Sequence, residues 1–156
     1  MSALIVILPI LLVAGAFLWL KPSPRDQFLA KLRTQALAEG FRVTSMRVPD
    51  LSEYGRVNSK FQIITLYQKG LNIKDGEVPE FTVLRTTGES GVYLSAGWCW
   101  EHRKNLQEAQ YSFLSSFLDQ LPTSVSAVTL SRDAIALSWD EKDPLVTFDQ
   151  LSRWLS

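Results

Sequence analysis

The sequence predicts an α+β fold in which helices cover an antiparallel sheet of about six strands, preceded by one N-terminal transmembrane helix. Three observations support this fold class. An uncharged apolar run opens the chain, strand-like segments are segregated from helix-like segments, and two turn-linked strands follow a long amphipathic helix. Together they give the element order α-β-β-β-β-α-β-β-α for the part of the chain after the apolar run.

The apolar run covers residues 3–20, which carry no charge and of which 16 are apolar. A helix of this length spans about 27 Å, close to the roughly 30 Å of a hydrocarbon core. Trp19 stands at its end, where an indole suits the membrane interface, and Lys21 follows. We therefore predict a single-pass anchor through which the protein contacts the lipid bilayer.

A cleaved signal peptide is the alternative, because Ala14-Gly15-Ala16 fits a small-x-small cleavage pattern. Only Met1 and Ser2 precede the apolar run, so the basic segment of a signal peptide is missing. Cleavage of residues 1–16 would also leave an apolar remnant at the new N-terminus. The anchor therefore explains the segment better.

The flanking charges predict the orientation of the anchor. No Lys or Arg precedes it, whereas Lys21, Arg25, Lys31 and Arg33 follow it. Positive flanks stay on the cytoplasmic side, so we expect a bacterial-type inner-membrane protein with its C-terminal domain in the cytoplasm. The single Cys99 fits a reducing compartment, because no disulfide can form within the chain. A periplasmic domain, cleaved or in the reverse orientation, is the alternative.

After the anchor, residues 21–24 read Lys-Pro-Ser-Pro and form a short linker, because proline interrupts a helix. A single soluble domain over 25–156 is expected to follow. Apolar periodicity predicts helices over 25–39, 102–121 and 147–155, and strands over 41–48, 61–68, 81–87, 92–100, 125–130 and 134–139. Short links between the first four strands predict an antiparallel meander, and the last two strands predict a hairpin.

The formal net charge is zero, but the two signs are separated along the chain. Residues 21–74 carry a net charge of +6 and residues 75–156 a net charge of −6. If the halves stay apart in the fold, the basic half favours an anionic bilayer surface and the acidic half favours water or a basic partner. An ordinary surface on which both halves interleave is the alternative.

The best group for catalysis or metal binding is Cys99-Trp100-Glu101-His102, which gathers the only Cys, the only His and a carboxylate. A Cys–His pair can form a nucleophile, and both residues bind zinc. The chain offers no second Cys or His to complete a zinc site, however. Cys99, Glu101 and His102 are therefore only weak catalytic candidates, and we predict no metal and no cofactor.

Binding is expected elsewhere. Tyr54 and Arg56 lie in a long segment of loop character. Trp98 and Trp100 share one face of a predicted strand, where with Trp139 they form either the core, which the size of the rings favours, or an exposed docking patch. Nucleic acid is not an expected partner, because the chain has no basic excess and its aromatic residues stand at core-like spacings. The sequence thus favours a non-catalytic interaction or accessory subunit of an inner-membrane complex, with unidentified protein partners. The alternative is an enzyme or small-ligand-binding domain that uses the region of Cys99 and His102.

Overall fold

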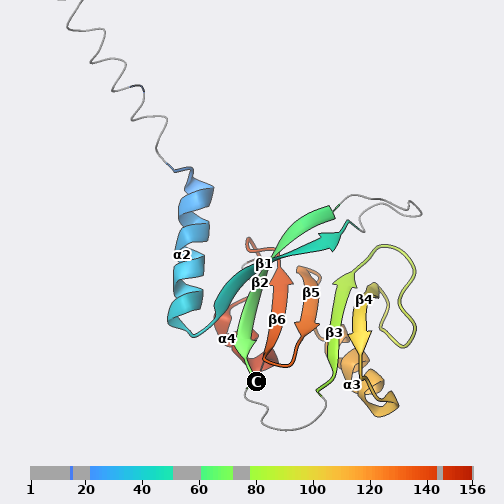
Figure 1. Ribbon diagram of the computed structural model, residues 1–156. Helices are drawn as coiled ribbons and strands as arrows, with labels where there is room; N and C mark the ends of the chain where they lie inside the picture. Colours follow the sequence, from blue (N-terminus) through green and yellow to red (C-terminus); the bar gives the residue numbers. More distant parts are fainter. Residues whose placement is uncertain (1–14, 16–21, 51–60, 72–77, 144–145, 156) are drawn as a thin grey trace, which may run out of the picture. The chain divides into compact units, whose positions relative to one another are not determined.

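The computed structural model describes residues 15, 22–50, 61–71, 78–143 and 146–155 (Figure 1). Among these residues, no helix is both long enough and apolar enough to cross a membrane. The predicted anchor over 3–20 lies outside the described residues except at residue 15, so it stays a prediction.

The chain divides into two compact units, residues 1–34 and 35–156, and helix α2, Pro24–Ala38, begins in the first and ends in the second. At its start, the Asp26 amide donates to the Ser23 hydroxyl over 3.1 Å, and that hydroxyl donates to the Asp26 carboxylate over 2.6 Å. These bonds satisfy groups that the first helical turn leaves without partners. Gly40 follows the helix with a φ of +83°, a conformation that glycine adopts without steric cost. The predicted helix over 25–39 is thus confirmed.

Six strands form one antiparallel sheet in the second unit (Figure 1). They are β1 Arg42–Pro49, β2 Phe61–Gly70, β3 Glu80–Arg85, β4 Trp98–Lys104, β5 Val125–Leu130 and β6 Ala134–Trp139. Their spatial order is β1-β2-β6-β5-β3-β4, so the predicted meander is wrong. The β5–β6 hairpin stands between β2 and β3 because these strands are the most apolar, and Ala127, Val128 and Leu137 are fully buried at the centre of the sheet.

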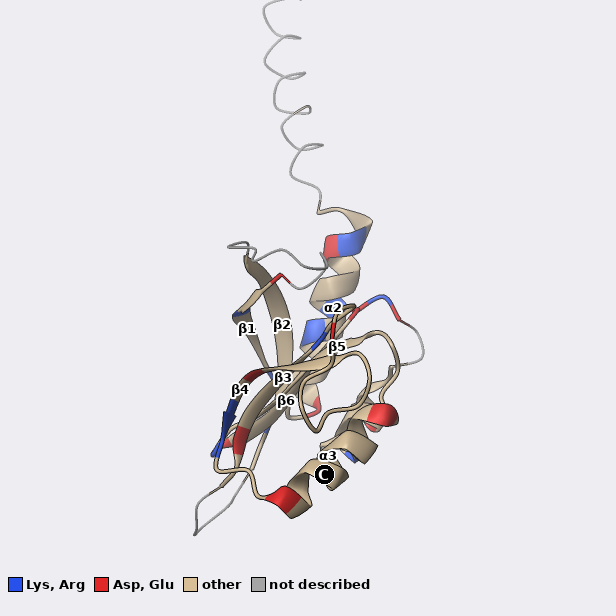
Figure 2. Ribbon diagram, turned by 90° about the vertical axis from the view of Figure 1, so that its right-hand side faces the viewer, with Lys and Arg blue, Asp and Glu red and all other residues tan. Residues whose placement is uncertain are grey.

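Two helices cover one face of this sheet, α3 Glu108–Asp119 and α4 Phe148–Trp154 (Figures 1 and 2). The ring of Phe148 packs against Tyr67 of β2 and Trp139 of β6, with centroid separations of 6.0 Å and 6.2 Å. The two sheet aromatics themselves lie 4.2 Å apart. The predicted α+β class, with helices over an antiparallel sheet, is therefore confirmed for the described residues.

Two predicted elements around β4 are wrong in their limits. The strand expected over 92–100 begins at Trp98, and the helix expected over 102–121 begins at Glu108, so His102 belongs to a strand. Backbone angles explain both differences, because Tyr93 and Asn105 have φ values of 66° and 56°. A residue in this left-handed region continues neither a strand nor a right-handed helix.

The β1–β2 hairpin bends away from the sheet at its outer end (Figures 1 and 2). Strand β2 pairs with β6 only over residues 67–70, so residues 61–66 pair with β1 alone. The outer half curls over the face opposite α3 and α4, where buried Val48 packs with Leu84 of β3 and Ala127 of β5. The curl thus builds a second small core on the helix-free face of the sheet.

Candidate functional site

The predicted site residues of β4 are described, whereas Tyr54 and Arg56 lie outside the described residues. Trp98 and Trp100 pair with Arg85 and Val83 of β3. Leu84 lies between these two β3 residues and packs with Val48 on the helix-free face, so Arg85 and Val83 face the other way. Both tryptophans therefore lie on the face that carries the helices. The predicted sharing of one strand face is confirmed, but the two side chains differ strongly in burial.

Trp98 is a core residue with 1% of its side chain exposed. The guanidinium carbon of Arg85 lies 4.4 Å from the centroid of its ring. The Nε of Arg85 donates to the carbonyl of Val125 over 2.8 Å, and Nη2 donates to the carbonyl of Pro122 over 3.0 Å. Desolvation on burial lowers the pKa of Arg85 from its ordinary value. This arrangement fixes β3 to the segment after α3, so Trp98 serves the fold here.

Trp100 is only partly buried and joins an aromatic cluster at the surface. Its ring meets Tyr111 of α3 edge-on at 6.0 Å, and Tyr111 stacks on Tyr93 at 5.1 Å. The guanidinium carbon of Arg103 lies 5.7 Å from the centroid of the Trp100 ring. We call Val92, Tyr93, Trp100, Arg103 and Tyr111 the aromatic patch. Tyr93 is 65% exposed, so the patch presents apolar area to solvent.

The segment between β3 and β4 is held against both β4 and α3, which positions the patch. The Gly91 amide donates to the Trp98 carbonyl over 2.8 Å, and the Trp100 indole N–H donates to the Val92 carbonyl over 2.9 Å. The Ser95 hydroxyl reaches the Ser115 carbonyl of α3 over 2.7 Å. The aromatic side chains are therefore presented by a segment with hydrogen bonds to two elements.

The backbone of Tyr93 is in a strained conformation. For a bulky residue, a φ of 66° is strained, and conformations of this kind cost on the order of 1–3 kcal/mol. Such strain is concentrated at functional sites, where the surrounding structure imposes it. The strained, exposed Tyr93 therefore marks the aromatic patch as a candidate binding surface.

The other flank of α3 borders an apolar groove of about 350 Å³. It is lined by Phe81 of β3, by Leu130 and Ile135 of the central strands, by Phe113 and Phe117 of α3 and by Trp154 and Leu155 near the C-terminus. Phe113 stands at this groove with 76% of its side chain exposed. Helix α3 carries Glu108 and Asp119 and no Lys or Arg. Its surroundings thus combine accessible apolar side chains on both flanks with negative charge on the helix.

Cys99 and His102 lie on the helix-free face of β4, because their β3 partners are Leu84 and Thr82. A regular strand would put them on opposite faces, but the register shifts at Glu101 and brings both onto one face. Burial, reinforced by the charge of Glu101, raises the pKa of the Cys99 thiol. A raised pKa keeps the thiol protonated and weakly nucleophilic at neutral pH. Among the described residues, no three His, Cys, Asp or Glu side chains are placed to hold a metal ion.

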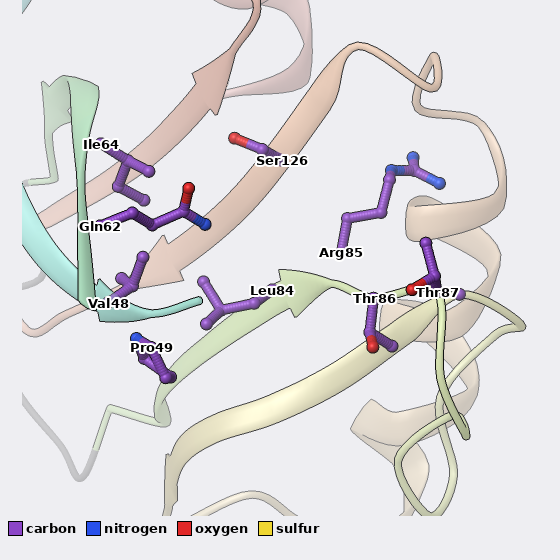
Figure 3. A pocket seen from close by; sticks show the side chains of 10 residues that line it. Val48, Pro49, Gln62, Ile64, Leu84, Arg85, Thr86, Thr87 and Ser126 are labelled. Carbon is purple, nitrogen blue, oxygen red and sulfur yellow. The ribbon is translucent and has the colours of Figure 1, made fainter. Parts of the chain in front are cut away.

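A second groove of about 350 Å³ opens on the helix-free face, between the curled hairpin and β3 (Figure 3). Val48, Gln62 and Ile64 line one side of it, and Leu84, Thr86, Thr87 and Ser126 line the other. Arg85 also borders it, but its guanidinium donates to the carbonyls near α3. An apolar groove with a few neutral polar groups suits a small uncharged ligand, and its described lining residues offer no acid–base pair.

The sequence predicts only part of the surface that the aromatic patch and the apolar groove form around α3. Trp100 is predicted because alternate residues of a strand, here Trp98 and Trp100, share one face. The sequence predicts a strand at Tyr93 and a helix at Phe113, and neither pattern indicates that these side chains are exposed. The glycines that flank Tyr93, Gly91 and Gly97, were the available signal that this segment turns.

No protein-family model, curated protein or solved structure matches the chain. The three candidate regions differ in their chemistry. Burial raises the pKa of the Cys99 thiol, which disfavours a reactive thiolate. The groove of Figure 3 has no titratable pair among its described lining residues, and the aromatic patch and the groove beside α3 expose aromatic and apolar groups.

Proposed function

We propose that this protein is a single-pass, membrane-anchored domain that binds a partner protein on the α3 surface, as a non-catalytic accessory subunit of a bacterial inner-membrane complex. By the α3 surface we mean the aromatic patch together with the apolar groove on the other flank of α3. The exposure of large apolar side chains on both flanks, Tyr93 at 65% and Phe113 at 76%, carries the proposal. The anchor over 3–20 and the cytoplasmic side of the domain are the sequence predictions given above.

The composition of this surface favours a protein partner over a small ligand. Tyrosine, tryptophan and arginine are the residues most enriched at the energetic centres of protein interfaces, and all three occur in the aromatic patch. Tyr93 and Tyr111 are stacked before any partner binds, which lowers the entropy lost on association. A groove beside this patch offers a place for an apolar anchor side chain of the partner.

The charge of α3 narrows the chemistry of the partner. Glu108 and Asp119 stand at the two ends of the helix, and residues 75–156 carry a net charge of −6. Electrostatic complementarity at an interface favours association with the opposite sign. We therefore propose a partner that presents apolar side chains within a rim of Lys or Arg.

A site-specific photocrosslinker in the full-length protein tests this function. It is placed at Tyr93 or at Phe113, with Arg132 in the β5–β6 turn as the exposed control position. The proposal predicts that both test positions yield the same protein adduct in native membranes and that the control position does not. Adducts of equal yield at all three positions, or a monomer that leaves mild detergent extraction with no copurifying protein, would contradict it.

The orientation of the domain has its own test. A C-terminal alkaline phosphatase fusion, which is active only outside the cytoplasm, is expected to be inactive, and a fluorescent protein fusion is expected to fluoresce. Mass spectrometry of the mature N-terminus distinguishes an intact anchor from cleavage after residue 16. The reverse pattern of reporters would place the domain in the periplasm and remove cytoplasmic partners from consideration.

The groove of Figure 3 supports a second candidate function, the binding of a small neutral ligand. Cys99 packs against the apolar cluster beside this groove, so this candidate keeps the region predicted for a ligand-binding domain. Native mass spectrometry of the full-length protein would detect a bound molecule. A Ser126→Leu variant, which narrows the groove, should lose that molecule, whereas Ser116→Leu on the exposed side of α3 should retain it.

A further inference from the structure

The outer half of the β1–β2 hairpin carries a second exposed apolar surface. Phe61 is 54% exposed and Ile63 is 77% exposed, and as alternate residues of β2 they lie on one face of the strand. Arg47 is the cross-strand partner of Ile63, and its guanidinium carbon lies 4.2 Å from the centroid of the Phe61 ring. We call Arg47, Phe61 and Ile63 the hairpin face.

The hairpin face takes no part in the two grooves or in the core of the sheet. Gln62 and Ile64 alternate with its apolar residues and line the groove of Figure 3, so the hairpin face is turned the other way. This half of β2 pairs with β1 alone. Two large apolar side chains therefore expose more than half of their surface on the outer half of the hairpin.

The charged residues within strands β1 and β2 are all basic. Strands β1 and β2 contain Arg42, Arg47 and Lys69 and no Asp or Glu. Cations next to exposed apolar side chains are the combination that binds an anionic membrane surface, with the apolar groups in the headgroup region and the cations at phosphates. The charged residues of helix α3 itself are acidic, whereas the aromatic patch beside it contains Arg103.

We propose that the hairpin face docks onto the anionic surface of the lipid bilayer, with Phe61 and Ile63 at the boundary between headgroups and acyl chains and Arg47 at lipid phosphates. The proposal rests on the proposed function in one respect, because the anchor predicted over 3–20 keeps the domain near the bilayer. A two-fold contact between two copies of the hairpin face would bring two Arg47 groups together, so like charges would repel each other in it.

The experiment uses full-length protein with Cys99→Ser and one new cysteine that carries an environment-sensitive fluorophore. The test position is Ser45, which is exposed on the same face as Arg47 and leaves the hairpin face intact, and the control position is Arg132. Each protein is placed in lipid nanodiscs of brominated phosphatidylcholine, with or without phosphatidylglycerol. Bromine quenches a fluorophore only near the acyl chains, so quenching reports contact with the bilayer.

With phosphatidylglycerol present, quenching at Ser45 should exceed quenching at Arg132. That difference should be lost in the Arg47→Glu and Ile63→Ser variants and reduced at 1 M salt, where the screening length falls to about 3 Å. Equal quenching at the two positions in discs that contain the protein would overturn the proposal. A blue shift at Ser45 that grows with protein concentration in lipid-free micelles would also overturn it and would indicate a second copy.

Failure of the anchor gives a different result from failure of the hairpin face. If the protein does not enter the discs, the anchor and the proposed function are wrong. The same labelled protein is then added to brominated vesicles that contain phosphatidylglycerol. Quenching at Ser45 above Arg132 on these vesicles supports the hairpin face as a lipid contact, and its absence overturns it.

Discussion

Arg85 and Trp98 are directly opposite each other on β3 and β4, and the arginine guanidinium carbon lies 4.4 Å from the centre of the indole ring. The same guanidinium donates to the carbonyl of Pro122, between α3 and β5, and to the carbonyl of Val125, the first residue of β5. One side chain thus links an edge pair of strands to the end of the helix that carries the proposed docking surface. Changes at Arg85 should therefore affect both folding and the position of α3.

Replacing Arg85 by methionine keeps much of the side-chain length but removes the donors to Val125 and Pro122. Hydrogen bonds from charged donors contribute about 1.5–3 kcal/mol each, so we expect a loss of a few kcal/mol in the free energy of unfolding. Thermal unfolding followed by tryptophan fluorescence measures this loss. Arg132→Met, at an exposed turn, is the matched control and should change stability by less than about 0.5 kcal/mol. Equal effects of the two variants would show that the contacts of Arg85 contribute little.

Gly91→Ala should displace Trp100. A Cβ at Gly91 would lie 2.8 Å from Cδ1 of the Trp100 ring and 3.3 Å from the Trp100 backbone nitrogen. Such overpacking costs about 1–3 kcal/mol, and the near-ultraviolet circular dichroism of the aromatic patch should change with it. Gly70→Ala is the control, because its Cβ would meet nothing within 4 Å. An unchanged spectrum in Gly91→Ala would refute the close packing described here.

The Tyr93→Asn variant should lose partner binding while its stability changes little. Asparagine tolerates a left-handed backbone better than tyrosine, which offsets the loss of the stacking on Tyr111. We expect stability within about 1 kcal/mol of the parent and a clear loss of the partner adduct from the photocrosslinker at Phe113. Ser116→Asn, on the exposed side of the same helix, should retain the adduct. Retention of the adduct in Tyr93→Asn would exclude the ring from the interface.

Alkaline pH should destabilise the protein through Cys99. Burial raises the pKa of this thiol above its ordinary value, so the folded protein holds the proton more tightly than the unfolded chain does. Its contribution to stability is complete below the unfolded pKa of about 8.5 and is lost as the pH rises through the folded pKa. Unfolding measured between pH 7 and pH 10 should show this decline, and Cys99→Ser should flatten it. A parallel decline in the variant would assign the effect to other groups.

The sequence predicted the local structure better than the arrangement of strands. The limits of β5 and β6 were predicted correctly because regular apolar residues end at polar turn residues on both sides. The meander was wrong because the choice of neighbouring strand depends on burial at the centre of the sheet, which adjacent strands in the sequence do not determine. Strand β4 was displaced because Val92 and Tyr93 resemble a strand in composition, whereas Gly91 and Gly97 turn the chain there.

In the candidate site, too, the sequence predicted local features better than features that depend on the folded chain. Trp100 was predicted from its spacing to Trp98, since alternation along a strand is a local property. Tyr111 and Phe113 were not recognised, because a stripe of apolar residues on a helix does not reveal which of its members remain at the surface. The strain at Tyr93 is visible only in the folded backbone.

Strand β4 ends the sheet, and its last four residues, Glu101, His102, Arg103 and Lys104, are exposed. An edge strand presents backbone groups that can pair with the edge of another sheet. Pairing at this edge would remove water from the charged side chains of Glu101, Arg103 and Lys104. Charged residues on an edge strand oppose pairing with another sheet. These four residues therefore disfavour edge-to-edge pairing at β4.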